Sequence, residues 1–252
     1  MGCLVRVGKA APRGSEAART GRSSPAPRDP PCNAVEGPIQ IRSTQQLGAR
    51  SGTGDENAAM RQPVPLDRCT RLLNHGPTVL VSAEHDGRRN VMAAAWSMPL
   101  DFTPPKVAVV LDKQTFTRGL LLASGRFVLA VPTVAMAALT DHVGSVSGRD
   151  VEKFSQALAA AEPGPATGAP LVDGCIAWLE CRHLPEPHIG QAYDLFLGEV
   201  VAAWADDRVF SNGRWHFDDA DDSLRSLHHI AGGHFFAIGN EVKYTPIAAP
   251  AD

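Results

Sequence analysis

The aromatic side chains of this 252-residue chain are confined to its later part, which limits where a hydrophobic core can form. All fifteen aromatic residues (four Trp, two Tyr and nine Phe) follow residue 60, and residues 1–59 contain none. Six prolines and eight glycines interrupt that first segment. Such a segment cannot bury enough apolar surface to offset its conformational entropy. We therefore expect residues 1–59 to be a disordered extension and residues 60–252 to form one domain.

The net charge of the chain changes sign at the same place, near residue 60. The net charge is −3, of which residues 1–59 carry +3 and the remaining residues −6. This balance argues against nucleic-acid binding as the main function. No apolar run approaches the roughly 20 residues that span a bilayer, so we expect no membrane contact. Five cysteines do not form a disulfide framework, and their low number favours a cytoplasmic protein.

The residues after 60 predict a mainly β domain. Strands and helices do not alternate regularly, which argues against a doubly wound sheet and favours a small antiparallel barrel with helical insertions. The dipeptide Asp86-Gly87 predicts a tight hairpin turn between two strands. We expect strands at 78–83, 90–97, 106–111, 127–131, 175–183, 193–204, 234–238 and 241–244, and helices at 66–73, 117–123, 134–142 and 150–160.

The motifs of several common active sites are missing. The sequence contains no HExxH or CxxC for zinc, no GxSxG nucleophile elbow, no P-loop and no GxGxxG. The densest histidine cluster is His228, His229 and His234, but neighbouring residues on a strand point to opposite faces. We therefore expect no bound metal, no catalytic nucleophile and no Rossmann-type nicotinamide site.

A run of small residues follows the predicted hairpin turn. Residues 90–97 read Asn-Val-Met-Ala-Ala-Ala-Trp-Ser. Small side chains on a strand let a flat ring approach the backbone, whose N–H groups can then bond to heteroatoms of the ring. Small strand residues also serve packing alone beneath a bulky neighbour. Composition leaves both interpretations open.

A second segment places serines and an arginine ahead of a predicted helix. Residues 144–154 read Gly-Ser-Val-Ser-Gly-Arg-Asp-Val-Glu-Lys-Phe. Ser145, Ser147 and Arg149 before a helix N-terminus would suit an anion such as phosphate. The other interpretation is an ordinary helix capped by Asp150, with a solvated arginine.

Together these segments resemble the flavin reductase family with an FMN-binding split barrel, in its flavoredoxin-like branch. The resemblance covers about residues 61–244 in the same order and does not extend into residues 1–59. Its motifs are N-x-M-x-x-x-W followed by D-F-x-P-P (Asn90, Met92, Trp96, Asp101, Phe102, Pro104, Pro105), K-x-T-x-T-R (Lys113, Thr115, Thr117, Arg118), V-P-T (131–133), S-G-R-D-x-x-K-F (147–154) and H-H-x-x-G-G-x-F (His228, His229, Gly232, Gly233, Phe235).

The resemblance implies a six-stranded antiparallel Greek-key barrel that forms a homodimer with FMN near the interface. It implies that residues 92–97, the small-residue strand, line the isoalloxazine ring and that His229 closes over the flavin. It also implies that the phosphate lies near Thr115, Thr117 and Arg118, beside the loop that carries Ser147 and Arg149. Where the family often has Thr or Ser, this chain has Ala93 and Ala95, so a hydroxyl contact to the flavin is lost. The implied cofactor-binding residues are Asn90, Met92, Ala93, Ala94, Ala95, Trp96, Ser97, Thr115, Thr117, Arg118, Ser147, Arg149 and His229.

The implied activity is electron transfer from NADH or NADPH to flavin, with a monooxygenase or another flavin acceptor downstream. The flavin supplies the redox chemistry, so no side chain need act as nucleophile or acid. One alternative is an FMN-containing electron carrier or flavin-binding module without NAD(P)H turnover. Another is a barrel that has lost flavin and serves as an interaction protein, which the alanines at 93 and 95 leave open.

Overall fold

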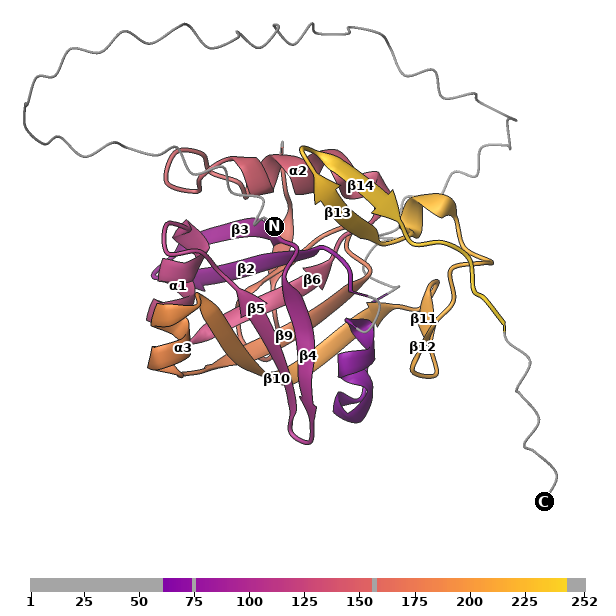
Figure 1. Cartoon of the computed structure of the whole chain (residues 1–252), viewed down its shortest axis with the longest axis horizontal. Coiled ribbons are helices and arrows are strands. Elements are labelled where there is room, and N and C mark those ends of the chain that lie inside the picture. The colour runs from indigo at the N-terminus through magenta and orange to yellow at the C-terminus, as the bar shows by residue number, and fades with distance from the viewer. Residues whose placement is uncertain (1–60, 74–75, 156–157, 244–252) are drawn as a thin grey trace, which may run out of the picture. The chain divides into compact units, whose positions relative to one another are not determined.

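The computed structural model describes residues 61–73, 76–155 and 158–243 (Figure 1). The extension expected at residues 1–59 and the last residues of the expected domain lie outside these ranges. The fold below therefore concerns the later part of the chain, where all the aromatic residues lie.

The described residues are built around one antiparallel sheet, which confirms the expected mainly β fold. Seven strands follow the order β3-β2-β6-β9-β10-β5-β4, and an eighth, β1, pairs with β10. The resemblance implied six strands, and the sheet has two more. The strands are β1 (Arg61–Pro63), β2 (Val79–His85), β3 (Arg88–Ala94), β4 (Ser97–Phe102), β5 (Pro105–Val110), β6 (Arg126–Val131), β9 (Ala177–Leu184) and β10 (Leu195–Asp206).

Strands β3 and β4 are consecutive in the chain but stand at opposite ends of this strand order. Only Ala95 and Trp96 join them, and three peptide links span at most about 11 Å. The two ends of the sheet must therefore lie close together, which curls the sheet into a barrel. The barrel stays open between β3 and β4, because each of these strands pairs on one side only. This opening is the split of the barrel.

The two faces of the sheet pack into two separate hydrophobic clusters, as alternation along a strand requires. Met92 and Ala94 of β3 belong to the cluster that also contains Phe127, Leu129 and Phe196. The second cluster, on the other face, contains the alternate β3 residues Val91 and Ala93 and is covered by α2 and β8. It comprises Leu80, Val91, Ala93, Val128, Ala130, Met136, Val143, Phe154, Ala159, Ala169, Leu171, Val172, Cys175 and Trp178.

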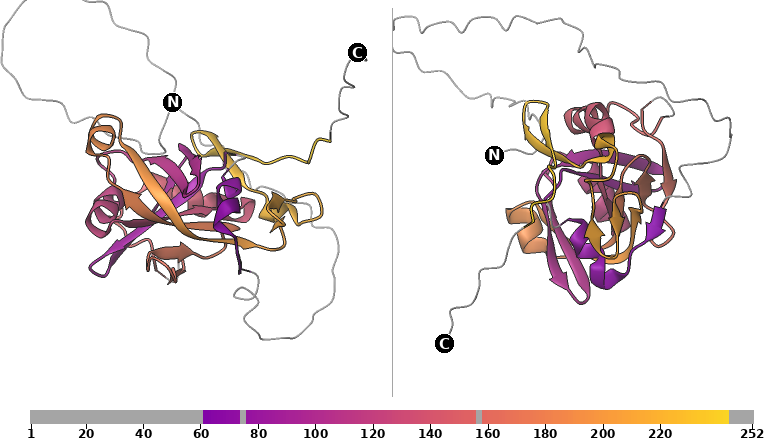
Figure 2. Two further views of the ribbon diagram at one scale, coloured as in Figure 1. Left: turned by 90° about the horizontal axis from the view of Figure 1, so that it is seen from below. Right: turned by 90° about the vertical axis from the view of Figure 1, so that its right-hand side faces the viewer.

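The helices and small hairpins lie around this sheet (Figures 1 and 2). Hairpin β13–β14 stands beside α2, and its turn residue Gly233 lies against Asp141 of that helix. These elements are the helices η2 (Leu66–Leu72), α1 (Phe116–Ser124), η3 (Val134–Met136), α2 (Ala137–Ser145), α3 (Pro187–Ala192) and η4 (Asp222–Leu224), and the hairpins β7 (Ala161–Pro163) with β8 (Pro170–Val172), β11 (Phe210–Ser211) with β12 (Arg214–Trp215), and β13 (Leu227–Ala231) with β14 (His234–Ala237).

Three element predictions were wrong. The helix expected at 150–160 is absent from the described residues of that range, which form turns and bends. The strand expected at 241–244 is absent from residues 241–243, and residue 244 is not described. The strand expected at 90–97 ends at Ala94, because the chain turns at Ala95 and begins β4 at Ser97.

Candidate functional site

One edge of β3 carries backbone groups that face the opening of the barrel. The turn before β3 has positive φ at Asp86 (50°) and Gly87 (72°), the type I′ geometry of a two-residue hairpin. His85 and Arg88 are therefore a hydrogen-bonded pair, and such pairs alternate with pairs that are not hydrogen-bonded. By this alternation the N–H and C=O groups of Val91 and Ala93 point away from β2, toward the opening.

The small residues of β3 serve packing as well as this open edge. Met92 and Ala94 are buried in one cluster, and Ala93 is buried in the other. Ala95 is half-buried, and the side chain of Trp96 is 48% exposed. The side chains of β3 thus serve packing, and close approach of a flat ring to the backbone edge at Ala93 stays a prediction.

The start of β3 is tied to the first turn of α1 through Asn90. This buried side chain donates from Nδ2 to Thr117 Oγ1 at 2.8 Å. Thr115 occupies the N-cap position of α1, but its hydroxyl donates to the Asp112 carbonyl and caps no N–H of the helix. The first N–H groups of α1 therefore have no side-chain partner among the described residues, the condition under which a helix N-terminus attracts an anion.

The segment 147–154 is not a helix. It packs against the corner formed by the start of β3 and the start of α1, where Asn90 meets Thr117. A Cβ at Gly148 would overlap the Asn90 amide, so only glycine allows this approach. Arg149 Nη1 donates to the Gln114 carbonyl at 2.6 Å, and its guanidinium lies 5.7 Å from the centroid of the Phe116 ring. Ser147 Oγ accepts from the Arg149 N–H at 3.2 Å. Arg149 therefore lies at the start of α1, and no helix follows it.

Lys153 links segment 147–154 to β3 and α2. Its ammonium donates to the carbonyls of Val91 on β3 at 2.9 Å and of Val143 on α2 at 2.8 Å. The residue is 2% exposed, and burial lowers the pKa of its amine to about 8. A buried ammonium bonded to two carbonyls explains why the helix expected at 150–160 does not form, since Lys153 must turn inward.

Arg118 makes internal contacts that the sequence did not indicate. Its guanidinium forms an ion pair with Asp194 at 2.5 Å and donates to the carbonyls of Gly190 and Leu111. It also lies 5.0 Å from the centroid of the Phe196 ring. These contacts join α1 to α3 and β10, on a different side of α1 from Phe116.

The other end of β3 adjoins the hairpin β13–β14. The His229 N–H donates to Thr78 Oγ1 at 2.8 Å, next to Val79, which pairs with Ala94. The His229 ring meets Phe235 edge-on, with centroids 5.5 Å apart. His229 and the end of the small-residue strand are therefore close to each other, and its closure over a flavin stays a prediction.

Buried polar atoms without partners gather among the predicted residues. Of the described residues, five have such a side-chain atom, and three of these are predicted site residues: Asn90 Oδ1, Ser97 Oγ and His229 Nε2. A buried polar atom without a partner costs about 1–3 kcal/mol, so such atoms mark where a ligand can bind. Asn90 lies near the start of β3 and the other two lie beyond its far end, and the four residue steps from Asn90 to Ala94 span about 13 Å. These residues fit an elongated ligand that carries hydrogen-bonding groups at both ends.

Sequence reasoning missed Arg88, Gln114, Phe116 and Gly148 as residues of this corner. Arg88 directly follows the hairpin turn, and its guanidinium lies 4.7 Å from the Phe116 ring centroid. Nothing in the spacing of these residues indicates that they meet. Their proximity depends on the pairing of β2 with β3 and on the docking of segment 147–154.

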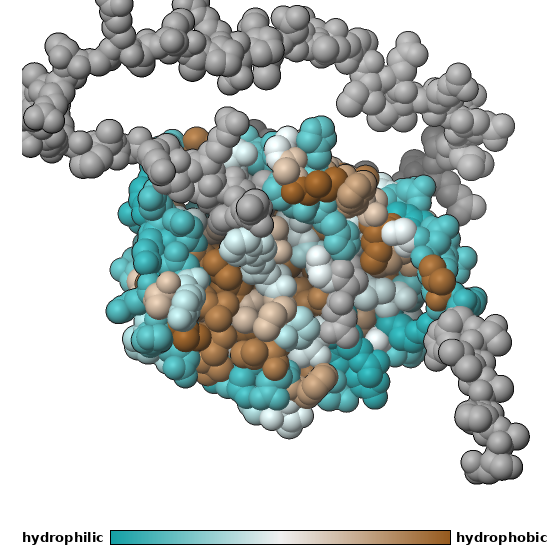
Figure 3. Space-filling model, viewed as in Figure 1, coloured by the Kyte–Doolittle hydropathy of each residue, from teal (hydrophilic) through white to brown (hydrophobic). Residues whose placement is uncertain are grey.

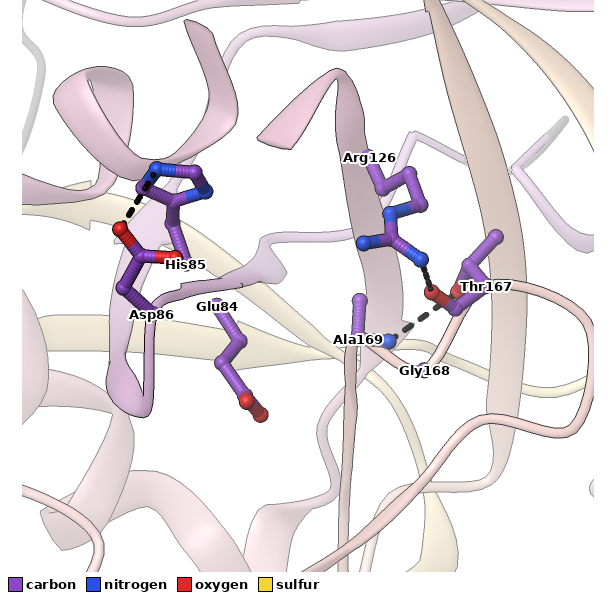
Figure 4. A pocket seen from close by; sticks show the side chains of 7 residues that line it. All are labelled: Glu84, His85, Asp86, Arg126, Thr167, Gly168 and Ala169. Carbon is purple, nitrogen blue, oxygen red and sulfur yellow. Dashed lines mark hydrogen bonds and ion pairs between the residues drawn. The ribbon is translucent and has the colours of Figure 1, made fainter. Parts of the chain in front are cut away.

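Two hollows lie elsewhere on the described residues. One, of 330 Å³, is lined by Glu84, His85, Asp86, Arg126 and residues 167–169 (Figure 4) and contains none of the predicted site residues. The other, of 280 Å³, lies between α1, α3 and β10, and Arg118 and Phe196 line it. Neither hollow brings the predicted residues together.

Membrane-spanning helices and clusters of metal-ligating side chains are absent from the described ranges. No helix there is long and apolar enough to cross a membrane. No group of three or more His, Cys, Asp or Glu side chains there is arranged to hold a metal ion.

Comparison with known sequences gives one family. Residues 71–225 match the family described as the flavin reductase like domain. The match covers more than half of the chain and includes β2 to β10 and the segment 147–154. It ends before His229, so the hairpin β13–β14 lies beyond it.

Individual relatives agree with this match. The Escherichia coli (strain K12) protein YddH is 51% identical over 183 residues, which cover 71% of this chain and 96% of YddH. A Shewanella baltica structure, described as an FMN-binding domain of a flavin reductase-like enzyme, is 50% identical with a TM-score of 0.71 and covers 73% of this chain and 97% of its own. The flavoredoxin of Methanosarcina acetivorans is 25% identical with a TM-score of 0.55, covering 67% of this chain and 87% of its own.

Proposed function

Because this chain belongs to the flavin reductase like domain family, we propose that it binds FMN in the opening between β3 and β4. One observation carries the proposal: buried polar atoms of Asn90, Ser97 and His229 lack partners at the two ends of an open strand edge. An elongated ligand with a polar ring system and a polar tail can satisfy all three. The Shewanella baltica relative, half identical in sequence, is described as FMN-binding.

The residues divide between the two ends of FMN. The backbone of Ala93 and Ala95, with Ser97 and His229, would hold the ring, while Met92, Ala94 and Trp96 complete the strand that positions it. Asn90 would bond the sugar chain. Thr115, Thr117, Ser147 and Arg149 surround the corner proposed for the phosphate, and Arg118 supports that corner through α1. Bound FMN would supply the redox chemistry, accepting a hydride and passing electrons onward.

We further propose that the electron donor is NADH or NADPH, which makes the protein a flavin reductase. The side chains then bind, orient and shield the flavin, and none acts as a nucleophile. Burial lowers the pKa of His228, so this neighbour of His229 stays neutral near pH 7. The Methanosarcina relative bears the name flavoredoxin, which keeps an electron carrier without NAD(P)H turnover as the alternative.

We also propose that the protein is a homodimer joined through β4. This end strand exposes three large hydrophobic side chains, Met98, Leu100 and Phe102, the last being 77% exposed, and Trp96 just before it is exposed as well. Hydrophobic residues gather over the region of β4 and β5 in Figure 3. An exposed hydrophobic face of this kind favours packing against another chain, and a second copy supplies a matching surface.

A cytoplasmic location and a downstream acceptor of electrons, such as a monooxygenase, belong to the same proposal. Cys69, Cys175 and Cys181 are all free and buried, which agrees with a reducing compartment. Residues 1–59 would then be an extension that plays no part in the barrel, with the domain starting at residue 60.

The test begins with purified full-length protein. We expect it to take up FMN with a flavin absorption spectrum and a quenched flavin fluorescence. Oxidation of NADH or NADPH with free FMN as acceptor then separates a reductase from a carrier. Protein that takes up no flavin would show that the proposed function is wrong. Flavin uptake without nucleotide oxidation would leave the carrier.

A further inference from the structure

Lys153 holds its ammonium at the edge of β3 that faces the opening of the barrel. Nζ donates to the Val91 carbonyl at 2.9 Å, and this carbonyl is one of the groups that point away from β2. The next group on the same edge is the N–H of Ala93, two residues or about 7 Å further along the strand. A flat ring that bonds to the Ala93 N–H therefore has a cation beside it.

This charge is buried and has no carboxylate partner. Lys153 is 2% exposed and is the one lysine or arginine among the buried residues of the described ranges. Its second bond, at 2.8 Å, goes to the Val143 carbonyl of α2, and it forms no ion pair in these ranges. Charges inside a protein act through a low dielectric and are screened little by salt, so the ammonium exerts its field on whatever occupies the opening.

Two arginines of the neighbourhood are placed differently. The guanidinium of Arg118 is paired with the Asp194 carboxylate, so the pair has no net charge. Arg149 is exposed at the start of α1, where water and salt screen it. Of these three cations, Lys153 is therefore the one whose charge acts on the strand edge with the least screening.

Reduction gives the flavin ring a negative charge that such a cation can stabilise. The oxidised ring is neutral. Two electrons and one proton, which a hydride from the proposed donor supplies together, leave the reduced ring with one negative charge near neutral pH. We propose that Lys153 favours this reduced, anionic form and thereby raises the redox potential of bound FMN. This inference rests on the proposed function and gives Lys153 no part in holding the phosphate.

The experiment measures two quantities on full-length protein near pH 7. One is the dissociation constant of oxidised FMN, from flavin fluorescence quenching. The other is the midpoint potential of bound FMN, from reduction by dithionite beside a reference dye. Together they give the affinity for reduced FMN relative to oxidised FMN. In Lys153→Met we expect this ratio to fall about tenfold, as the loss of one nearby buried charge implies, which lowers the potential by about 30 mV.

Two further variants separate the charge from the hydrogen bonds. Lys153→Arg keeps the charge and should keep most of the ratio. Lys153→Gln can still donate to one of the two carbonyls but is neutral, so it should behave like Lys153→Met. Lys243→Met is the matched control, because Lys243 is exposed and lies outside every helix and strand. It should change neither quantity.

Three outcomes would overturn the inference while leaving flavin binding by wild type intact. Equal weakening of reduced and oxidised FMN in Lys153→Met, with an unchanged potential, would make Lys153 a structural residue only. A potential lowered as much in Lys153→Arg as in Lys153→Met would show that the charge is not the cause. Loss of flavin uptake in all three variants of Lys153 would assign it to the fold alone. Wild type that takes up no flavin would overturn the proposed function as well.

Discussion

Lys153 brings a positive charge into the folded chain without a carboxylate partner in the described ranges. Its ammonium is bonded to two backbone carbonyls, one on β3 and one near the end of α2. The Val143 carbonyl lies in the last turn of α2, where carbonyls lack partners within the helix. The charge thus satisfies two backbone groups, at the expense of a lowered pKa for the amine.

This burial predicts a pH-dependent stability. The pKa of Lys153 is about 8 in the folded chain against 10.5 for an ordinary lysine. Between these values the unfolded chain holds the proton and the folded chain does not, so the free energy of unfolding rises as pH rises. The penalty of the buried charge is fully present below pH 8 and is relieved by about pH 10.5.

Urea unfolding of wild type and Lys153→Met from pH 7 to 10.5 checks this. Subtracting the variant removes the contribution of every other titrating group. We expect the stability of wild type relative to Lys153→Met to increase across the window. Two parallel curves would mean that Lys153 titrates as an ordinary lysine.

Gly148 offers a second prediction for a single residue. A Cβ at this position would overlap the Asn90 amide, so Gly148→Ala must move either Asn90 or the segment 147–154. We expect a loss of about 1–3 kcal/mol of stability, as for other overpacked sites, and weaker FMN binding in a fluorescence titration. Gly119→Ala is the control, since a Cβ there meets nothing and lies in the interior of α1. That variant should be as stable as wild type or more so.

The loop between β7 and β8 depends on one buried carboxylate. Glu180 Oε2 accepts from the N–H groups of Ala166 and Thr167 and from the Thr167 hydroxyl. Its other oxygen accepts from the Trp204 indole at 3.0 Å. The prolines and glycines of residues 162–170 favour a loop, but the carboxylate that shapes it lies on β9.

Glu180→Gln should therefore destabilise the protein. The amide replaces one acceptor oxygen with an NH2 group that only donates, so at least one buried donor loses its partner. We expect a loss of about 1–3 kcal/mol in denaturant unfolding. Glu199→Gln on β10 is the control, because Glu199 forms no hydrogen bond or ion pair in the described ranges. A loss in Glu180→Gln no larger than in the control would contradict this account.

Strand and helix predictions succeeded where the signal was local. Asp86-Gly87 fixed the first hairpin through backbone geometry, and Gly125, in the left-handed conformation, ends α1 where expected. The prediction for 150–160 failed because its helical pattern competed with a contact to strand β3, far away in sequence. The candidate site shows the same division: the sequence marks β3 and Arg149 as candidates, whereas Arg88 and Phe116 come next to them only through tertiary packing.

At the scale of the whole molecule, the exposed face of β4 predicts the assembly. Met98 is 53% exposed, and we expect Met98→Lys to place a charge in the proposed dimer interface. Light scattering should then show a dimer for wild type and a shift toward monomer for the variant. Val242→Lys is the control, since Val242 is 89% exposed and lies outside every helix and strand. A monomeric wild type would remove β4 as an interface.

The order of the strands ties ligand binding to cooperative folding. Because β3 and β4 end the strand order, the opening between them exists only after all seven strands have paired. A flavin bound there cannot be retained by a partly folded barrel. The binding free energy of FMN would therefore add to the free energy of unfolding of the whole sheet. Saturating FMN should then slow amide hydrogen exchange in all of its strands.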